Sequence, residues 1–210
     1  MIIKVCGMRD ADNIRQVDEL GNVDWMGFIF YPPSSRHVSE VPGYLPRHCK
    51  RVGVFVNATP EEIQQRQEAF DFDIIQLHGH ETPDFCKALP HHLKVGTKLI
   101  KMVQIASQKD LEDTSQYEGL VDYFLFETKY KGYGGSGQQF DWNILQHYTG
   151  KTPFLITGGI GADDAERIKT LNSQLSTLNF IGIDLNSRFE TAPALKDITL
   201  IDQFIKQIKA

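Results

Sequence analysis

Short runs of β-branched and aromatic residues recur along this chain with helix-like segments between them, and this rhythm limits the possible folds more than any other feature. Successive runs begin about 22 to 30 residues apart, close to the length of one strand, one helix and two loops. We predict eight strands, at residues 2–8, 25–31, 51–57, 73–79, 99–105, 123–129, 153–159 and 179–185. Strand alternating with helix in this way predicts parallel strands joined by right-handed crossovers.

Most connections between these strands contain the signals with which helices begin. Residues 59–62, Thr-Pro-Glu-Glu, combine an N-cap, a proline at the first helical position and a capping-box glutamate, and residues 82–84 begin in the same way. Ser107 and Asp163 each precede a further helical pattern. Residues 38–50 are the exception, because two prolines and a glycine interrupt them and permit at most a short or irregular helix.

These elements fit a single (β/α)8 barrel, one domain over residues 1–210, at the small end of the size range of that fold. A doubly wound open sheet is the alternative. No G-x-G-x-x-G follows the first strand, however, and no G-x-x-x-x-G-K-[ST] occurs in the sequence. We therefore predict a closed barrel, in which the chemistry gathers where the strands end.

Composition argues against several classes of function. Lys and Arg number 22 and Asp and Glu 27, and the resulting net charge of −5 argues against a general nucleic-acid binder. No apolar stretch approaches the roughly 20 residues that cross a bilayer, and the first residues do not resemble a secretory signal. We expect a cytoplasmic protein with no membrane or nucleic-acid partner.

The cysteines and histidines predict neither a disulfide scaffold nor a metal site. Cys6, Cys49 and Cys86 are odd in number and far apart, which suits a reducing compartment, and we expect the last two to pack in helices. The histidines within 78–80 and 91–92 lack the H-E-x-x-H spacing and a third ligand.

Polar side chains and glycines gather at the predicted carboxyl ends of the strands. They are Cys6 and Gly7, residues 31–36, Asn57, and residues 76–79, 127–129, 157–159 and 184–187. A ring of polar groups at one mouth of an apolar barrel is what a small-molecule site requires. The glycine clusters at 134–137 and 157–159, with the turn after Asp184, can direct backbone N–H groups at an anion. We therefore predict a bound phosphate.

Three side chains of this ring each have two interpretations. Cys6 is either an inert buried residue or, with a lysine two residues earlier on the same strand face, a thiol placed to act as a base. Glu127 either meets the barrel mouth or is a surface carboxylate paired with Lys129 or Lys131. Arg36 is either a solvated loop charge or the side chain that grips a planar carboxylate with two parallel hydrogen bonds.

Several motifs occur together, in order, over essentially the whole chain. They are KVCG at 4–7, GFIFY at 27–31 followed by SR at 35–36, VGVFVN at 52–57, QLHG at 76–79, and GGSG at 134–137 followed by FDW at 140–142. In this combination the sequence resembles the phosphoribosylanthranilate isomerases of tryptophan biosynthesis. The resemblance implies a small (β/α)8 barrel without cofactor that converts N-(5-phosphoribosyl)anthranilate to 1-(2-carboxyphenylamino)-1-deoxyribulose 5-phosphate, an Amadori rearrangement.

The resemblance also implies roles for individual residues. Cys6 is the expected general base, Glu127 the general acid and Arg36 the partner of the anthranilate carboxylate. The expected substrate-binding residues, including the phosphate cradle, are His78, Gly134, Gly135, Gly137, Thr157, Gly158, Gly159, Asp184, Asn186 and Ser187. A small-molecule phosphosugar is the expected partner, for a monomer or homodimer that works alone or with other tryptophan-pathway enzymes.

The sequence departs from the family pattern in two places. Glu127 stands where the pattern has aspartate, and Arg188 lies in a turn where small residues are usual, which adds a cation near the expected phosphate. One methylene more on the acid can move its carboxyl by about 1 Å, a displacement that can cost roughly 10²-fold in rate. An attenuated or catalytically silent phosphosugar-binding barrel is therefore one alternative, and a related barrel isomerase or epimerase for another sugar phosphate is a second.

Overall fold

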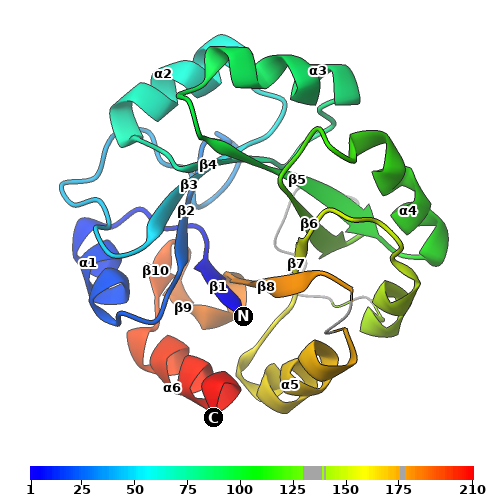
Figure 1. Ribbon diagram of the computed structural model, residues 1–210. Helices are drawn as coiled ribbons and strands as arrows, with labels where there is room; N and C mark the ends of the chain where they lie inside the picture. The colour runs from blue at the N-terminus through cyan, green and yellow to red at the C-terminus, as the bar shows by residue number, and fades with distance from the viewer. Residues whose placement is uncertain (130–138, 140, 176–177) are drawn as a thin grey trace.

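Eight parallel strands close into one ring in the order β1 to β8, with β1 paired to both β2 and β8. The structure is a computed structural model in which residues 1–129, 139, 141–175 and 178–210 are described. Figure 1 looks along the barrel, with the helices outside the ring of strands. The predicted (β/α)8 barrel is confirmed, and the open-sheet alternative is wrong.

Each predicted run overlaps one barrel strand, although β3 and β5 begin one residue before their runs. The strands are β1 (Ile2–Val5), β2 (Trp25–Ile29), β3 (Lys50–Phe55), β4 (Ile74–Leu77), β5 (Lys98–Ile105), β6 (Tyr123–Thr128), β7 (Phe154–Ile156) and β8 (Phe180–Leu185). Most strands end before the predicted run does, because the polar residues and glycines at those ends belong to the loops that follow. Cys6, for example, comes directly after β1 rather than at its last position.

Helices cover the outside of the ring in most connections. They are α1 (Ala11–Glu19), α2 (Pro60–Phe70), α3 (Pro83–Ala88), α4 (Gln108–Glu112), α5 (Ala165–Gln174) and α6 (Ile198–Lys209). Short 3-10 turns lie at Leu89–His92, Asp113–Tyr117, Trp142–His147, Ala162–Asp164 and Ser187–Phe189.

The local sequence signals account for where several helices begin. The predicted capping box is present, because Thr59 Oγ1 accepts from the N–H of Glu62 while the Glu62 carboxylate accepts from the N–H of Thr59. No helix forms between β2 and β3, as the prolines of residues 38–50 predict. Cys86 lies buried in α3 as expected, whereas Cys49 lies in the loop before β3, so its predicted place in a helix is wrong.

The inside of the ring changes from apolar to polar along the strands. Its apolar cluster includes Ile74, Leu125 and Leu155, which are fully buried. Because side chains two residues apart share a face, the next inward positions along β4, along β6 and just after β7 hold Gln76, Glu127 and Thr157. These polar side chains therefore meet one another at the carboxyl ends of the strands.

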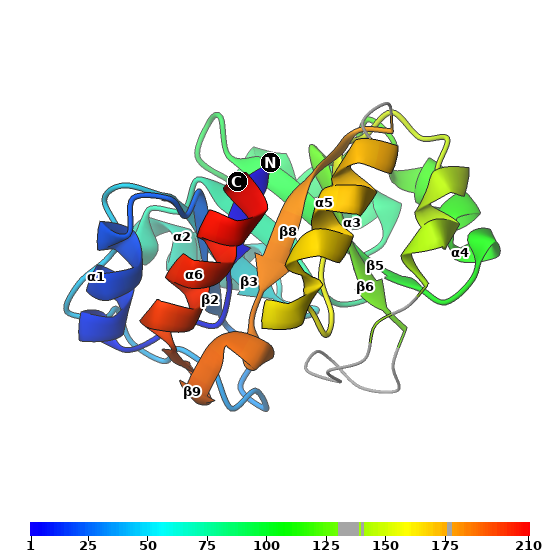
Figure 2. The same ribbon diagram turned by 90° about the horizontal axis from the view of Figure 1, so that it is seen from below.

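A two-stranded hairpin, β9 (Glu190–Ala192) and β10 (Leu195–Lys196), follows β8 at the same end of the barrel. In Figure 2 the two termini lie together at the upper side and β9 at the lower side. Asn13 of α1 ties down this hairpin, because its side chain accepts from the N–H of Lys196 at 2.7 Å and donates to the Lys196 carbonyl at 3.0 Å. Among the described residues, no helix is long and apolar enough to cross a membrane.

Candidate active site

A cavity of about 340 Å³ opens at the carboxyl ends of the strands. Every described residue among the expected catalytic and substrate-binding residues lines it: Cys6, Arg36, His78, Glu127, Thr157, Gly158, Gly159, Asp184, Asn186 and Ser187. Arg188, expected to add a cation near the phosphate, is not among its lining residues. The predicted Gly134, Gly135 and Gly137 lie outside the described residues. The structure thus brings together residues from almost the full length of the chain, while the part that each plays stays a prediction.

Cys6 stands on the inner side of the barrel, where the neighbouring strand leaves room for its sulfur. A Cβ on Gly27 of β2 would lie 2.7 Å from Cys6 Sγ, so only glycine admits the thiol at this point. The side chain is almost enclosed, with 3% of the residue exposed. Burial raises the pKa of the Cys6 thiol above its usual range, and the ammonium group of Lys4 only partly opposes the rise.

A buried ion pair lies beside this thiol. Lys4 Nζ is 2.9 Å from Asp184 Oδ2, and the backbones of the two residues are neighbours in the β1–β8 ladder. Burial by itself would lower the pKa of Lys4, but Asp184 and Cys6 outweigh it and the pKa of Lys4 is raised. Lys4 therefore stays charged next to Cys6, which is the electropositive setting that favours a thiolate.

Glu127 points into the cavity from β6 and is largely buried. Its Oε2 atom lies 3.1 Å from Nε2 of His78, which follows β4. The amide of Gln76 lies 2.9 Å from the other ring nitrogen, Nδ1, of His78. The His78 ring thus lies between the Gln76 amide and the Glu127 carboxyl.

The surface interpretation of Glu127 is wrong in the part that the structure describes. Lys129, one of the two predicted partners, pairs with Asp110 at 3.2 Å, and Lys131 lies outside the described residues. Glu127 instead lies beside the imidazole of His78, which follows β4.

Arg36 lies in the loop after β2, with its guanidinium at the rim of the cavity. It is bound by a carboxylate of the protein itself: Nε and Nη2 donate to Glu190, the shortest contact being 2.6 Å from Nη2 to Oε2. These hydrogen bonds raise the pKa of Arg36. Arg36 is therefore an oriented guanidinium rather than a solvated loop charge.

Loops after β7 and β8 form another part of the cavity wall. Gly158 and Gly159 adopt φ values of 94° and 67°, which favour glycine, and they follow Thr157. Asn186 and Ser187 stand beside them after β8. Glycine turns at the ends of the last strands of a barrel are a common phosphate site, because backbone N–H groups can converge there.

Sequence reasoning missed two charged residues of this region, Glu190 and Lys196. Lys196 Nζ is buried and contacts both the Glu190 carboxylate and Asn186 Oδ1, the latter at 2.9 Å. Glu190 lies 154 residues after Arg36, and no local pattern links two charges at that separation.

Comparison with known proteins gives one consistent result. The family model described as N-(5'-phosphoribosyl)anthranilate (PRA) isomerase matches residues 3–207. An N-(5'-phosphoribosyl)anthranilate isomerase from Phocaeicola vulgatus is 51% identical over 209 residues, covering 100% of this chain and 98% of the relative. One from Parabacteroides distasonis is 49% identical, covering 99% of this chain and 93% of the relative.

Two solved structures of phosphoribosylanthranilate isomerases are also similar to this chain. A phosphoribosylanthranilate isomerase in complex with reduced 1-(o-carboxyphenylamino)-1-deoxyribulose 5-phosphate is 26% identical, with a TM-score of 0.74 over 100% of this chain and 99% of that one. A structure of monomers of the dimeric enzyme from Thermotoga maritima is also 26% identical, with a TM-score of 0.75 over the same shares of the two chains.

Proposed function

This chain belongs to the N-(5'-phosphoribosyl)anthranilate isomerase family, and we propose that its cavity performs the Amadori rearrangement with Cys6 as general base and Glu127 as general acid. The observation that supports these roles most is that both side chains, from strands far apart in the sequence, line the same cavity as Arg36. Family membership makes the chain an enzyme of tryptophan biosynthesis.

The reaction needs both an acid and a base. Opening of the furanose ring requires a proton on the ring oxygen as its bond to C1′ breaks, which leaves an iminium. A base then removes the proton from C2′ to give an enolamine, and tautomerisation yields the ketone. Glu127 delivers the first proton, and the imidazole of His78 beside it keeps the carboxyl directed into the cavity.

Cys6 removes the proton from C2′. A thiol whose pKa is raised by burial is mostly protonated at rest, but its thiolate is correspondingly basic. When the ring opens, the positive charge of the iminium forms next to Cys6. This charge and Lys4 together favour the thiolate at the step in which the proton leaves C2′. The rearrangement moves protons only, so we propose that it proceeds without a cofactor.

The other parts of the cavity bind the two ends of the substrate. Arg36 receives the anthranilate carboxylate, and the turns at 157–159 and 186–187 receive the phosphate, with Gly134, Gly135 and Gly137 as further proposed phosphate ligands outside the described residues. We propose a single domain over residues 1–210 that acts in the cytoplasm as a monomer or homodimer, alone or with other enzymes of the pathway. The dimeric relative supports the homodimer.

Substitution of the acid and of the base tests the roles. Cys6→Ala and Glu127→Gln should each lower kcat by about 10²-fold or more, because each removes one proton transfer. Turnover is followed by the loss of substrate fluorescence, and binding of the reduced product analogue checks that the cavity is intact. Full turnover by either variant would disprove that residue's role.

The same assay bears on the two alternatives. Measurable turnover by the unmodified chain would exclude a silent barrel, and competition among sugar phosphates would expose another preferred substrate. The comparisons favour neither alternative, since the relatives named above share one activity name.

A further inference from the structure

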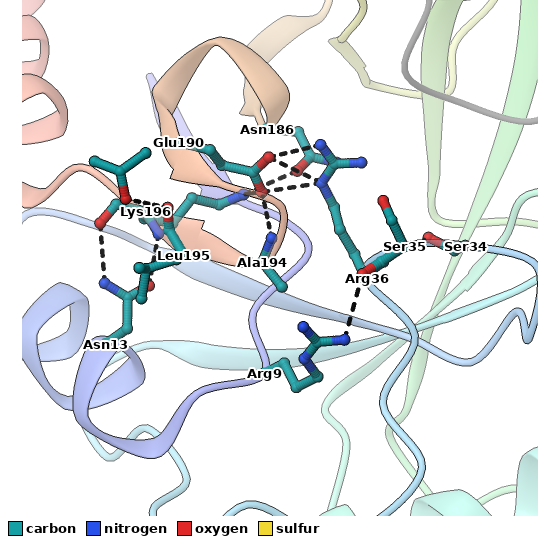
Figure 3. Close-up of polar contacts among 11 residues, drawn as sticks. Arg9, Asn13, Ser34, Ser35, Arg36, Asn186, Glu190, Ala194, Leu195 and Lys196 are labelled. Carbon is teal, nitrogen blue, oxygen red and sulfur yellow. Dashed lines mark hydrogen bonds and ion pairs between the residues drawn. The ribbon is translucent and has the colours of Figure 1, made fainter.

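A cluster of three ions lies beside the cavity and includes residues with no part in the proton transfers. Figure 3 shows the Glu190 carboxylate between Arg36 and the ammonium group of Lys196. Oε1 of Glu190 accepts from Arg36 Nε at 2.9 Å, from Lys196 Nζ and from the N–H of Ala194 at 3.2 Å. Oε2 accepts from Arg36 Nε at 3.0 Å and from Nη2 at 2.6 Å.

The cluster is buried and supported on several sides. The side chains of Lys196, Glu190 and Arg36 are 0%, 3% and 16% exposed. Lys196 also donates to Asn186 Oδ1, while Asn13 holds its backbone on both sides. Charges are costly to bury unless they are paired and hydrogen-bonded, so this is a built arrangement rather than a chance surface contact.

The way in which Glu190 binds Arg36 leaves one edge of the guanidinium for a ligand. Glu190 takes the edge formed by Nε and Nη2, whereas the edge formed by Nη1 and Nη2 keeps its remaining N–H groups. Figure 3 shows the third guanidinium nitrogen on the side away from Glu190. Arg36 lines the cavity, so a carboxylate within the cavity can reach that second edge.

The backbone next to the catalytic thiol makes room for this arrangement. Gly7 has a φ of 77°, and a Cβ there would lie 2.6 Å from Arg36 Cδ and 2.8 Å from Asn186 Oδ1. The absent side chain lets Arg36 cross the chain beside Cys6 and reach Glu190.

The cluster has one surplus positive charge when its groups are ionised, since two cations surround one anion. Burial would raise the pKa of Glu190, but Arg36 and Lys196 outweigh it and the pKa is lowered. Burial lowers the pKa of Lys196, and the Glu190 carboxylate opposes this change. A ligand carboxylate would neutralise this surplus positive charge, whereas an aromatic ring without a carboxylate would not.

We propose that Glu190 and Lys196 are positioning residues, which fix the guanidinium of Arg36 so that its second edge selects substrates with a carboxylate on the aromatic ring. This inference rests on the proposed function, in which Arg36 binds that carboxylate. Lys196 anchors Glu190, Glu190 orients Arg36, and Arg36 alone touches the substrate.

Glu190 could affect the binding of a ligand carboxylate by its negative charge or by holding Arg36 in place, and the two effects have opposite signs. If its charge were all that mattered, removing the anion would strengthen the binding of a carboxylate. If it acts by position, removing its two-point grip on Arg36 weakens that binding. The double variant Glu190→Gln with Lys196→Met separates the two effects. It removes one negative and one positive charge, so the cluster keeps its single surplus positive charge while Arg36 loses its partner.

The experiment is calorimetric titration with two probes. One is reduced 1-(2-carboxyphenylamino)-1-deoxyribulose 5-phosphate, and the other is the same molecule with hydrogen in place of the carboxyl group. The unmodified enzyme should prefer the carboxylated probe. In the double variant its Kd should rise by about ten- to a hundredfold more than the Kd of the carboxyl-free probe, because both probes carry the phosphate and only one has a partner for Arg36.

Steady-state kinetics gives an independent readout. KM for the substrate should rise in the double variant much more than kcat falls, because the carboxylate is bound both before and during the chemical steps. Glu118→Gln is the matched control, since Glu118 also accepts several hydrogen bonds, from Tyr148, Lys151 and Thr152, but next to the amino end of β7. It should leave both Kd values unchanged.

The outcomes separate this inference from the proposed function. A double variant with the full preference for the carboxylated probe would overturn the positioning role. An unmodified enzyme without that preference would overturn the role of Arg36, and this inference with it. If the double variant does not fold, Glu190→Asp replaces it: the charge remains, but the shorter side chain withdraws from Arg36, and a retained preference would again refute the proposal.

Discussion

Burial and nearby charges of both signs set the proton affinity of Cys6. Burial raises the pKa of the thiol, Lys4 lowers it and Asp184 raises it. Because only the thiolate is alkylated, the rate at which iodoacetamide modifies Cys6 should increase with pH through the alkaline range. A serine or an alanine at this position would lack any such titration.

Substitution of these neighbours should move the pH profile in opposite directions. Lys4→Met removes a charge that favours the thiolate, so the rise in the alkylation rate of Cys6 should shift to higher pH. Asp184→Asn removes a charge that opposes the thiolate, so the rise should shift to lower pH. The measurement is the rate of iodoacetamide modification of Cys6 against pH for the three proteins, followed by mass spectrometry of the Cys6 peptide, and shifts of the same sign would contradict this account.

The sequence alone predicted which way some site residues face, but not which residues they contact. Alternation along β6 placed Glu127 at the mouth, because facing depends only on local sequence. Its neighbour His78 follows β4, and Glu190, the partner of Arg36, lies in β9. Such contacts depend on the closure of the barrel, and a single sequence does not specify them.

At the scale of elements, no helix forms between β2 and β3, and hydrogen bonds to one buried carboxylate hold that segment in place. Asp18 of α1, 2% exposed, accepts from the hydroxyl of Tyr44 and from the N–H groups of Arg47 and His48 at 2.7, 2.8 and 2.9 Å. Burial would raise the pKa of Asp18, but these donors outweigh it and the pKa is lowered. The irregular segment is thus fixed by side-chain bonds rather than by helical ones.

Asp18→Asn should destabilise the fold by about 1 to 3 kcal/mol at pH 7, because a charged acceptor of several hydrogen bonds is lost. A carboxyl with a lowered folded-state pKa stabilises the protein above its unfolded-state pKa of about 3.9. That contribution disappears as the pH falls through the folded-state pKa, so the difference between the two proteins should shrink in acid.

Urea unfolding at pH 7 and below pH 4 measures this effect. Asp12→Asn is the control, because Asp12 lies on the same helix with its side chain 85% exposed. A difference between Asp18→Asn and the unmodified protein that grows in acid would contradict the assignment.

The elements themselves were largely predictable, and the reasons are local. Capping residues such as Thr59 and breakers such as the prolines of residues 38–50 act within a few residues of themselves. The connection between β6 and β7 contains a 3-10 turn, Trp142–His147, among its described residues. The hairpin β9–β10 was not predicted, since it is short and is held by Asn13 from the other end of the chain.

At the scale of the whole molecule, the cavity draws its walls from seven of the eight strands or the loops that follow them, β5 being the one without a lining residue. A ligand that contacts Cys6, Arg36 and Ser187 together would connect distant parts of the ring. It binds the folded chain only, so its binding free energy adds to the stability of the entire barrel.

The reduced product analogue at about 100 times its Kd should therefore raise Tm by roughly 5 to 10 °C. Differential scanning calorimetry measures the shift. Arg36→Met should reduce it at the same ligand concentration, whereas Glu118→Gln should not. An equal shift for Arg36→Met would show that the guanidinium contributes nothing to binding.

The pairing of β1 with β8 has a consequence for how the protein is made. Residues 2–5 leave the ribosome long before residues 180–185, by about 10 to 40 s at ordinary rates of translation. Throughout that interval one edge of the first strand has no neighbour, and exposed strand edges invite association with other chains. Until its last strand arrives, the nascent chain therefore carries a strand edge that only the end of its own sequence can cover.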